Sequence, residues 1–428
     1  MSYPLFLALG LLGAADLQST DLSGQVFNSS GQPVSQAKVF ILTAYPRVGG
    51  VILCPPGCAA YQEQATTDAS GKFEIRSLPP ELLFQLTVAA DGYQLKFVDH
   101  ADPAKGPLEV RLVRQPPKVP ADRTIGGRVI SVDGKPIIGA VVSAYGHYTA
   151  TGREWGRSPA CVTNGHGEFL IVANAGDLAY DFEVLCLGYA QQNFRRVEVG
   201  RAGLEFHLAE GVTVRGRILK DGKAVPGMFV AISLTHRRGS YETLLRAMQI
   251  ATDSDGQFVL RNVPPDNEYY VWTPMHGTTK FGSIPVQTID VAGDCTVKDL
   301  GNLNLAPVFR LAGRIVLTDG QPLPPSARIL LRHGEVGSDT QTMMLKPGGS
   351  FCFEGVPKGV VRLIVEQAVT EKGVTLITRL RGYQLATDRT PMQQSQPGEV
   401  VLFVDADKAD LQIFFEREGA KPPIRASN

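Results

Sequence analysis

The stretch Asp68-Ala69-Ser70-Gly71-Lys72-Phe73 recurs in this chain and decides the fold. The other copies are Asn164-Gly165-His166-Gly167-Glu168-Phe169, Asp253-Ser254-Asp255-Gly256-Gln257-Phe258 and, more loosely, Lys346-Pro347-Gly348-Gly349-Ser350-Phe351. In the first three copies an Asp or Asn side chain can accept backbone hydrogen bonds, and glycine supplies a positive φ angle. The phenylalanine that follows can then enter a core. The pattern predicts the same tight turn between two β-strands, made four times.

A glycine two residues before an apolar residue opens each copy. These glycines are Gly24, Gly127, Gly216 and Gly313. Their spacing of roughly 100 residues is too long for a solenoid unit and fits the size of an independent domain. The sequence therefore predicts four domains in tandem over residues 16–118, 119–211, 212–307 and 308–428, of which the last is the most divergent.

The segments between the turns have the composition of β-strands. Apolar runs rich in β-branched and aromatic residues, bounded by Gly, Pro and Asp, occur at 37–42, 141–145, 228–234 and 328–331. Helical spacing is nearly absent, and only residues 241–250 could form helical turns. We therefore predict an all-β fold of four tandem Ig-like or prealbumin-like antiparallel β-sandwich domains.

The order of these motifs resembles that of the carboxypeptidase regulatory-like domain, a transthyretin-like (prealbumin-like) seven-stranded sandwich. The shared order is G-x-V, D-G-x-P, an apolar strand, T-D-x-x-G-x-F, L-P-P and G-Y, and it runs through the chain after residue 15 or so. It is clear in copies one to three and weaker in copy four. The resemblance implies a non-catalytic module that accompanies peptidases, outer-membrane receptors and surface or secreted proteins. It also implies a fold shared with carbohydrate-binding modules.

The N-terminal residues have features of a signal peptide. The apolar residues 4–13 have the length of a signal-peptide core, and small residues precede a cleavage site after Ala15. The segment before them lacks Lys and Arg, and the alternative is a buried or frayed N-terminal strand. No later segment has the length and apolarity of a transmembrane helix. We therefore expect residues 1–15 to be a signal peptide and the mature chain to be extracytoplasmic, either periplasmic or secreted, with no membrane span.

The charges balance, since 42 Lys and Arg residues face 42 Asp and Glu residues. No net field then attracts nucleic acid or an anionic membrane. We expect no nucleic-acid partner, and the partner class that remains is a glycan or a protein at the cell surface or in the periplasm.

The chain has six cysteines, an even number that fits an oxidising compartment. Alignment of the copies predicts that Cys161 and Cys186 flank neighbouring core strands, so that they form either a disulfide or two buried thiols. Cys54 and Cys58 could close a small loop disulfide. A zinc site there would need a second pair of ligands, which the sequence does not supply.

One motif suggests catalysis, the H-x-x-E of His207 and Glu210. Alignment places His207 at an alternating polar position of a strand, where side chains three residues apart point to opposite faces. Nucleophile-elbow and phosphate-loop motifs are absent from the sequence. We predict no enzyme activity, no metal and no cofactor; the rival is a peptidase-associated accessory protein or a cryptic metallopeptidase. A surface adhesin with intramolecular isopeptide bonds is disfavoured, because the first strands carry Val26, Val129, Ile218 and Ile315 where such domains carry lysine.

Binding through loops is the function class that remains. The loop 147–158 carries the candidate site residues Tyr148, Arg153, Glu154 and Trp155. An exposed indole beside charged groups can stack on a sugar ring or anchor a protein partner; the alternative is a tryptophan packed on the rim of its own sandwich. Further candidate loops are 45–61, 236–249 and 275–284, while Trp272 is expected in a core. The sequence favours a non-enzymatic binding or structural module, with a carbohydrate-binding protein as the alternative.

Overall fold

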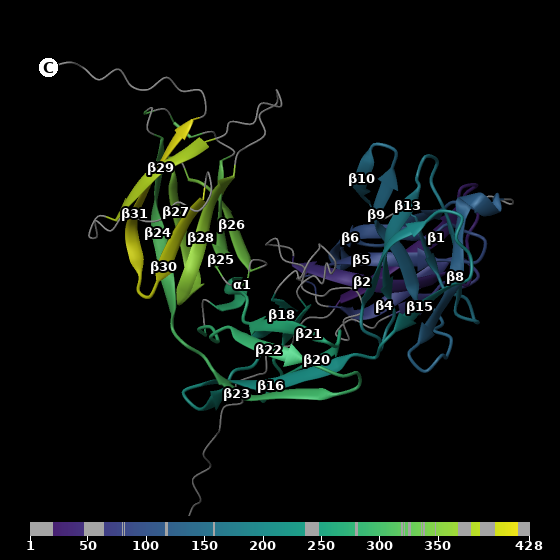
Figure 1. The fold of residues 1–428 in the computed structure, drawn as a ribbon, viewed down its shortest axis with the longest axis horizontal. Helices are drawn as coiled ribbons and strands as arrows, with labels where there is room; N and C mark the ends of the chain where they lie inside the picture. The colour runs from purple at the N-terminus through teal and green to yellow at the C-terminus, as the bar shows by residue number, and fades with distance from the viewer. Residues whose placement is uncertain are drawn as a thin grey trace, which may run out of the picture. The chain divides into compact units, whose positions relative to one another are not determined.

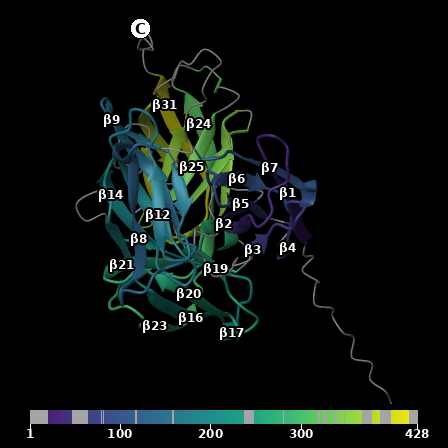
Figure 2. The ribbon, with the colours of Figure 1, turned by 90° about the vertical axis from the view of Figure 1, so that its right-hand side faces the viewer.

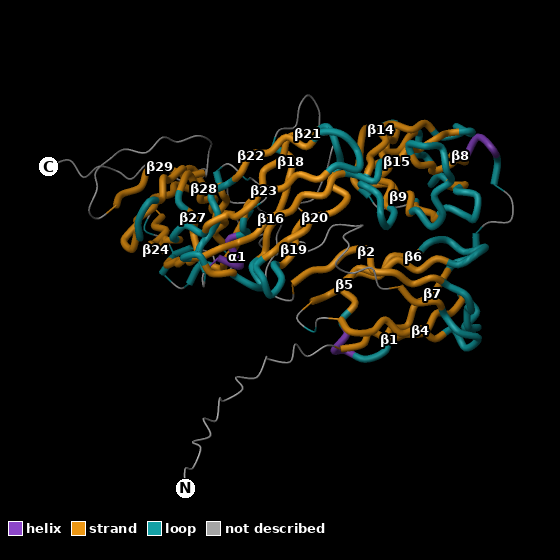
Figure 3. Tube along the Cα trace, turned by 90° about the horizontal axis from the view of Figure 1, so that it is seen from below, coloured by secondary structure: helices purple, strands orange, loops and turns teal. Residues whose placement is uncertain are grey.

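The computed structural model of the chain is nearly all β, and the helix among its described residues is confined to short turns (Figures 1 and 3). The structure describes residues 20–46, 64–78, 80, 82–115, 119–156, 159–235, 248–278, 281–317, 320, 322–323, 327–334, 336, 339–346, 348–366, 378–385 and 399–417. The predicted signal peptide, Cys54 and Cys58 lie outside these residues. In the described part, no helix has the length and apolarity needed to cross a membrane.

The described strands form eight sheets, and each sheet draws its strands from one of the four predicted segments, which we call repeats 1 to 4. Repeat 1 contains β1 (Thr20–Asn28), β2 (Lys38–Pro46), β3 (Gln64–Thr66), β4 (Lys72–Leu78), β5 (Leu82–Ala89), β6 (Lys96–Ala101), the 3-10 helix η2 (Pro103–Lys105) and β7 (Leu108–Leu112). Its sheet orders are β4-β1-β7 and β3-β2-β5-β6. These seven strands set the scheme that the other repeats follow.

Repeat 2 begins with the 3-10 helix η3 (Ala121–Arg123) and continues with β8 (Thr124–Ser131), β9 (Val141–Thr149), β10 (Gly152–Trp155), β11 (Ala160–Val162), β12 (Glu168–Val172), β13 (Ala179–Leu185), β14 (Gln192–Glu198) and β15 (Leu204–Leu208). Its sheets are β12-β8-β15 and β10-β9-β13-β14, and β11 also pairs with β9. Aromatic rings fill the space between the sheets: Phe206 lies 4.9 Å from Phe169 and 3.9 Å from Phe194 between ring centroids. Strand β10 has no counterpart among the described residues of repeat 1.

Repeat 3 contains β16 (Val212–Lys220), β17 (Lys223–Ala224), β18 (Phe229–Leu234), β19 (Met248–Ala251), β20 (Gln257–Val263), β21 (Asn267–Trp272), α1 (Met275–Thr278), β22 (Gln287–Val291) and β23 (Val297–Asn304). One layer holds β16, β17, β20 and β23 (Figure 2). The other layer holds β18, β19, β21 and β22. The expected helical turns at 241–250 are wrong for residues 248–250, because these pair with β18 as strand β19.

Repeat 4 contains β24 (Val308–Leu317), β25 (Arg328–His333), β26 (Thr340–Met344), β27 (Ser350–Pro357), β28 (Gly359–Glu366), β29 (Thr378–Leu385), β30 (Glu399–Val404) and β31 (Lys408–Arg417). Its sheets are β27-β24-β31-β29 and β26-β25-β28-β30. The extra strand β29 pairs with β31 at the edge of the first sheet. The divergent sequence of repeat 4 thus keeps the seven-strand scheme and adds one strand to it.

The first and last strands of each repeat pair in parallel. The opening glycines allow this pairing at close range. A Cβ atom on Gly127 would lie 2.1 Å from the carbonyl oxygen of Leu204, and one on Gly313 would lie 2.1 Å from that of Leu411. The repeated G-x-V motif is therefore a packing requirement.

The second glycine turn has the predicted construction. In repeat 1 the Asp68 carboxylate accepts hydrogen bonds from the N–H groups of Ser70 at 2.8 Å and Lys72 at 2.9 Å, and Gly71 has φ 76°. The buried Thr67 before it donates to the Val34 carbonyl at 2.8 Å and accepts from the Ala37 N–H at 2.8 Å. Thr163 and Thr252 make the same two kinds of bond in repeats 2 and 3. This threonine ties the turn to the loop between the first two strands.

Candidate functional site

The predicted site loop of repeat 2 is a β-hairpin through Trp155. Strand β10 runs back along β9, with Arg153 opposite Tyr148 and Trp155 opposite Gly146. Gly152 has φ 140°, a conformation that other residues rarely adopt, and it lets the chain reverse after two turn residues. The prediction of a loop is therefore wrong for residues 147–149 and 152–155, which lie in strands β9 and β10.

Arg153 is held by a buried carboxylate that the sequence analysis did not identify. Asp181 of β13 has no exposed side-chain surface, and its Oδ2 lies 2.8 Å from Nε and 2.7 Å from Nη2 of Arg153. The Tyr148 hydroxyl donates to the same oxygen at 3.3 Å, and the Arg196 N–H donates to Oδ1 at 2.8 Å. Burial acts to lower the pKa of Arg153, but the hydrogen bond and charge of Asp181 outweigh it and the net shift is upward. Arg153 therefore stays a fixed cation.

Asp181 lies on the outer face of its sheet, away from the core. Its neighbours along β13, Tyr180 and Phe182, belong to the hydrophobic core of repeat 2. Because side chains alternate along a strand, Asp181 points to the opposite face. Gly146 on the adjacent strand leaves room for Arg153 there, since a Cβ atom on this glycine would lie 2.8 Å from Arg153 Nη2.

Rings and cations alternate across this outer face. The Arg153 guanidinium carbon lies 3.9 Å from the ring centroid of Trp155 and 6.0 Å from that of Tyr148, and the Arg196 guanidinium carbon lies 5.4 Å from that of Tyr148. Trp155 nevertheless keeps 59 % of its surface exposed. We call Tyr148, Arg153, Trp155, Asp181 and Arg196 the outer-face platform.

An open groove borders this platform at the hairpin turn. Its lining includes Tyr148, Thr149, Thr151, Leu178, Arg196 and Glu198. The groove therefore offers hydroxyl groups, one cation and one carboxylate around an aromatic ring. Such a set can donate and accept several hydrogen bonds at once.

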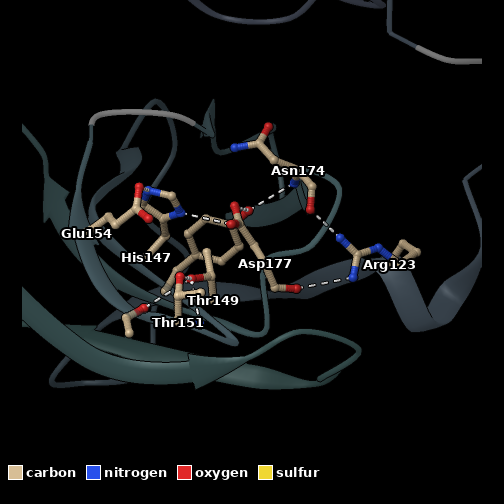
Figure 4. A network of polar contacts seen from close by, with 9 residues as sticks. Arg123, His147, Thr149, Thr151, Glu154, Asn174 and Asp177 are labelled. Atoms are coloured by element: carbon tan, nitrogen blue, oxygen red, sulfur yellow. Dashed lines mark hydrogen bonds and ion pairs between the residues drawn. The ribbon is translucent and has the colours of Figure 1, made fainter.

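Glu154 belongs to a separate network (Figure 4). Its carboxylate lies 3.7 Å from Nε2 of His147, whose Nδ1 lies 2.8 Å from Oδ1 of Asp177. The Tyr180 hydroxyl donates to Asp177 Oδ2 at 2.5 Å, and Arg123 donates to the carbonyls of Asn174 and Asp177. Burial acts to raise the pKa of Asp177, but the hydrogen bonds from Tyr180 and His147 outweigh it, so the pKa is lowered. The structure thus brings Tyr148, Arg153 and Trp155 together and separates Glu154 from them.

Of the two alternatives for Cys161 and Cys186, the disulfide is not formed, and both thiols are free. Cys161 of β11 pairs with Val142 of β9, and Val142 pairs on its other side with Val184 of β13. Strand β9 therefore separates the two cysteines by two strand spacings, about 10 Å, which exceeds the Cα separation that a disulfide tolerates. Burial raises the pKa of the Cys161 thiol to about 12, as expected for a thiol packed in a core.

His207 occupies the exposed strand position that alignment predicts. It lies on β15 opposite Ile130, and its Nε2 lies 3.8 Å from Glu205. Among the described residues no group of three or more His, Cys, Asp or Glu side chains could hold a metal ion.

The remaining candidate loops fall into two classes. Most of 45–61 and residues 236–247 lie outside the described residues. The candidate loop 275–284 begins with α1, and its first residue, Met275, is fully buried in the hydrophobic core cluster of repeat 4. The interpretation of Met275 as part of a free binding loop is therefore wrong. Trp272 is buried, as predicted, with 3 % of its surface exposed.

Comparison with known proteins supports the predicted resemblance for repeat 1. Residues 21–112 match the family model of the carboxypeptidase regulatory-like domain. The curated proteins contain no match to the chain.

Among solved structures, the chain is similar to a streptococcal ancillary pilin, with 12% sequence identity over 67% of this chain and 99% of that one, and a TM-score of 0.22. It is also similar to the Bacillus anthracis TIE protein, with 11% identity over 95% of this chain and 75% of that one, and a TM-score of 0.19. A minor pilin of Streptococcus agalactiae shows 11% identity over 50% of this chain and its full length, with a TM-score of 0.23. At these TM-scores the likenesses carry no argument about function.

Proposed function

We propose that this chain is a non-catalytic tandem β-sandwich protein in which repeat 2 binds a ligand through the outer-face platform. The observation that carries the proposal is Trp155, which is 59 % exposed although its ring is stacked on Arg153. Arg153 is in turn fixed by the buried Asp181. A rigid aromatic group with fixed neighbours loses little conformational entropy on binding, which favours affinity.

The ligand that suits this surface has a flat apolar face bordered by polar groups. A sugar ring fits this description, and so does an aromatic side chain of a protein partner. The hydroxyl groups of Thr149 and Thr151 and the charged groups of Arg196 and Glu198 in the adjoining groove favour the saccharide. Carbohydrate binding is therefore the specific form of the proposal that we favour.

The proposed setting is extracytoplasmic, in the periplasm or outside the cell. The support is the N-terminal apolar segment with small residues before Asp16, together with the balanced charge of the chain. The mass of the protein isolated from its native source tests this setting, since we expect a chain that begins at Asp16. A native chain that retains Met1 contradicts it.

Trp155→Ala is the first prediction, with Leu170→Ala as the matched control. Leu170 is 56 % exposed and lies on β12, in the other sheet of the same repeat. On an array of neutral and acidic oligosaccharides we expect the wild type and Leu170→Ala to bind and Trp155→Ala to lose binding. Because an exposed cation–π contact contributes only about 0.5–1 kcal/mol, Trp155→Ala should lower the free energy of unfolding by less than about 1 kcal/mol. Equal binding by all three proteins contradicts the site, and a loss of several kcal/mol identifies Trp155 as a packing residue.

A further inference from the structure

A segment of repeat 3 completes the core of repeat 4. Met275, at the start of α1, has no exposed surface and belongs to the same core cluster as Leu311, Ile329 and Val361 of repeat 4. The Thr278 hydroxyl at the end of α1 donates to the Gly355 carbonyl of β27 at 2.6 Å. Helix α1 therefore lies against β26 and β27 of repeat 4. The side chain that a binding loop would present to solvent is thus buried in the next sandwich.

A second apolar contact lies beside the first. Trp272, the last residue of β21, packs with Ala231 of β18 and with Val336 from the loop between β25 and β26. All three residues have 3 % or less of their surface exposed. Two separate apolar contacts therefore join repeats 3 and 4.

Asp339 lies at this contact between repeats 3 and 4, which we call the joint, and only one of its carboxyl oxygens has a hydrogen-bond partner. Its Oδ1 accepts the N–H of Met275 at 3.1 Å, while its Oδ2 is buried without a hydrogen-bond partner. Among the described residues from His333 to Asp339, the other titratable group is His333 at the end of β25, whose backbone N–H donates to the Asp339 carbonyl at 2.9 Å and whose Nδ1 accepts the N–H of Val336. From α1, the uncharged backbone N–H of Met275 faces Asp339.

Burial raises the pKa of Asp339 to about 7, and the Met275 N–H only partly opposes this effect. An unfolded aspartate has a pKa of about 3.9. The neutral acid therefore fits the folded joint better than the carboxylate does. Since the folded pKa is the higher one, the stabilisation is complete below about pH 4 and is lost as the pH rises towards 7.

We propose that repeats 3 and 4 unfold as one cooperative unit because Met275 completes the core of repeat 4, and that ionisation of Asp339 weakens this joint. The proposal is independent of ligand binding by repeat 2. The segment 272–278 of repeat 3 docks on repeat 4: Met275 enters the core of repeat 4, and Trp272 packs against Val336. Protonation of Asp339 at acidic pH stabilises the contact between repeats 3 and 4, and its ionisation at neutral pH destabilises this contact.

Hydrogen exchange of the full chain, followed by mass spectrometry of peptides, tests the cooperative unit. Met275→Ala leaves a cavity in the core of repeat 4 and should speed exchange in β27 and β28 at least about tenfold. Met344→Ala is the matched control, because Met344 lies in β26 of the same repeat and is 54 % exposed. Peptides from β1 and β4 of repeat 1 should exchange equally in all variants. Unchanged exchange in β27 and β28 of Met275→Ala overturns the proposal.

The role of Asp339 is tested by measuring hydrogen exchange of the wild type as a function of pH. After correction for intrinsic exchange rates, protection of β27 and β28 should fall between pH 5 and pH 8, while protection of repeat 1 should change less. Asp339→Asn cannot ionise and should remove this dependence. A flat profile in the wild type overturns the role of Asp339, even if Asp339→Asn fails to fold.

Discussion

Asp181 is a carboxylate with no contact to solvent, and Arg153 is the cation that balances it. Removing one partner of a buried ion pair leaves the other charge uncompensated, which costs far more than the pair itself contributes. The Arg196 N–H and the Tyr148 hydroxyl would remain as its hydrogen-bond donors. The stability of repeat 2 thus depends on a residue of the proposed binding surface.

The second prediction compares Arg153→Ala with Arg128→Ala. We expect Arg153→Ala to lower the free energy of unfolding of repeat 2 by about 3 kcal/mol. Arg128 pairs with Glu168 at 3.3 Å, but both side chains are largely exposed, so its removal should cost at most about 1 kcal/mol. Denaturant unfolding of the fragment 119–211 measures both losses. Equal losses in the two variants show that the Arg153 pair is solvated.

The sequence could identify half of this arrangement. Tyr148, Arg153 and Trp155 attract attention because they gather in a polar, glycine-rich stretch. Asp181 does not, because it is one of two acids at alternating positions of the strand Ala179–Leu185, and acids at such positions normally face solvent. Its role arises only when pairing places Gly146 beside it and Arg153 above it. That pairing depends on the register between β13 and β9, which shifts between Asp181 and Phe182 of β13.

At the scale of elements, turns were the most predictable parts. The Asp68 turn and its copies determine their own geometry through local hydrogen bonds, so short sequence motifs identify them. The all-β class is also predictable from local sequence, since β-branched and aromatic runs bounded by Gly, Pro and Asp are typical of strands. The sequence predicts a loop where the hairpin β9–β10 lies, because polar residues and glycine are typical of loops. An edge strand such as β10 tolerates both.

Elements whose position depends on distant partners were not predictable. The sequence could not decide between a Cys161–Cys186 disulfide and two free thiols, because the alignment does not reveal that β9 lies between β11 and β13. The position of α1 could not be predicted either. Met275 lies only four residues after Val271, which belongs to the core of repeat 3, yet Met275 is buried in the core of repeat 4. Such contacts depend on tertiary packing, which no local pattern encodes.

At the scale of the whole molecule, the domain boundaries stay a prediction. Each sheet of the described residues stays within one repeat, which favours independent folding of repeat 2. We expect the fragment 119–211 to give an all-β circular dichroism spectrum and a single cooperative unfolding transition. A molten or insoluble fragment contradicts the boundary near residue 119 or that near residue 211.

The parallel pairing of the first and last strands has a mechanical consequence. Because these strands run in the same direction, the chain enters and leaves a repeat at opposite ends of one hydrogen-bonded ladder. Tension along the chain then acts parallel to the strands and loads the bonds between them in shear. In repeat 2 the residue pairs from Gly127 and Leu204 to Ser131 and Leu208 must share that load and yield together. The glycines that mark each repeat in the sequence are the residues that let this force-bearing ladder close.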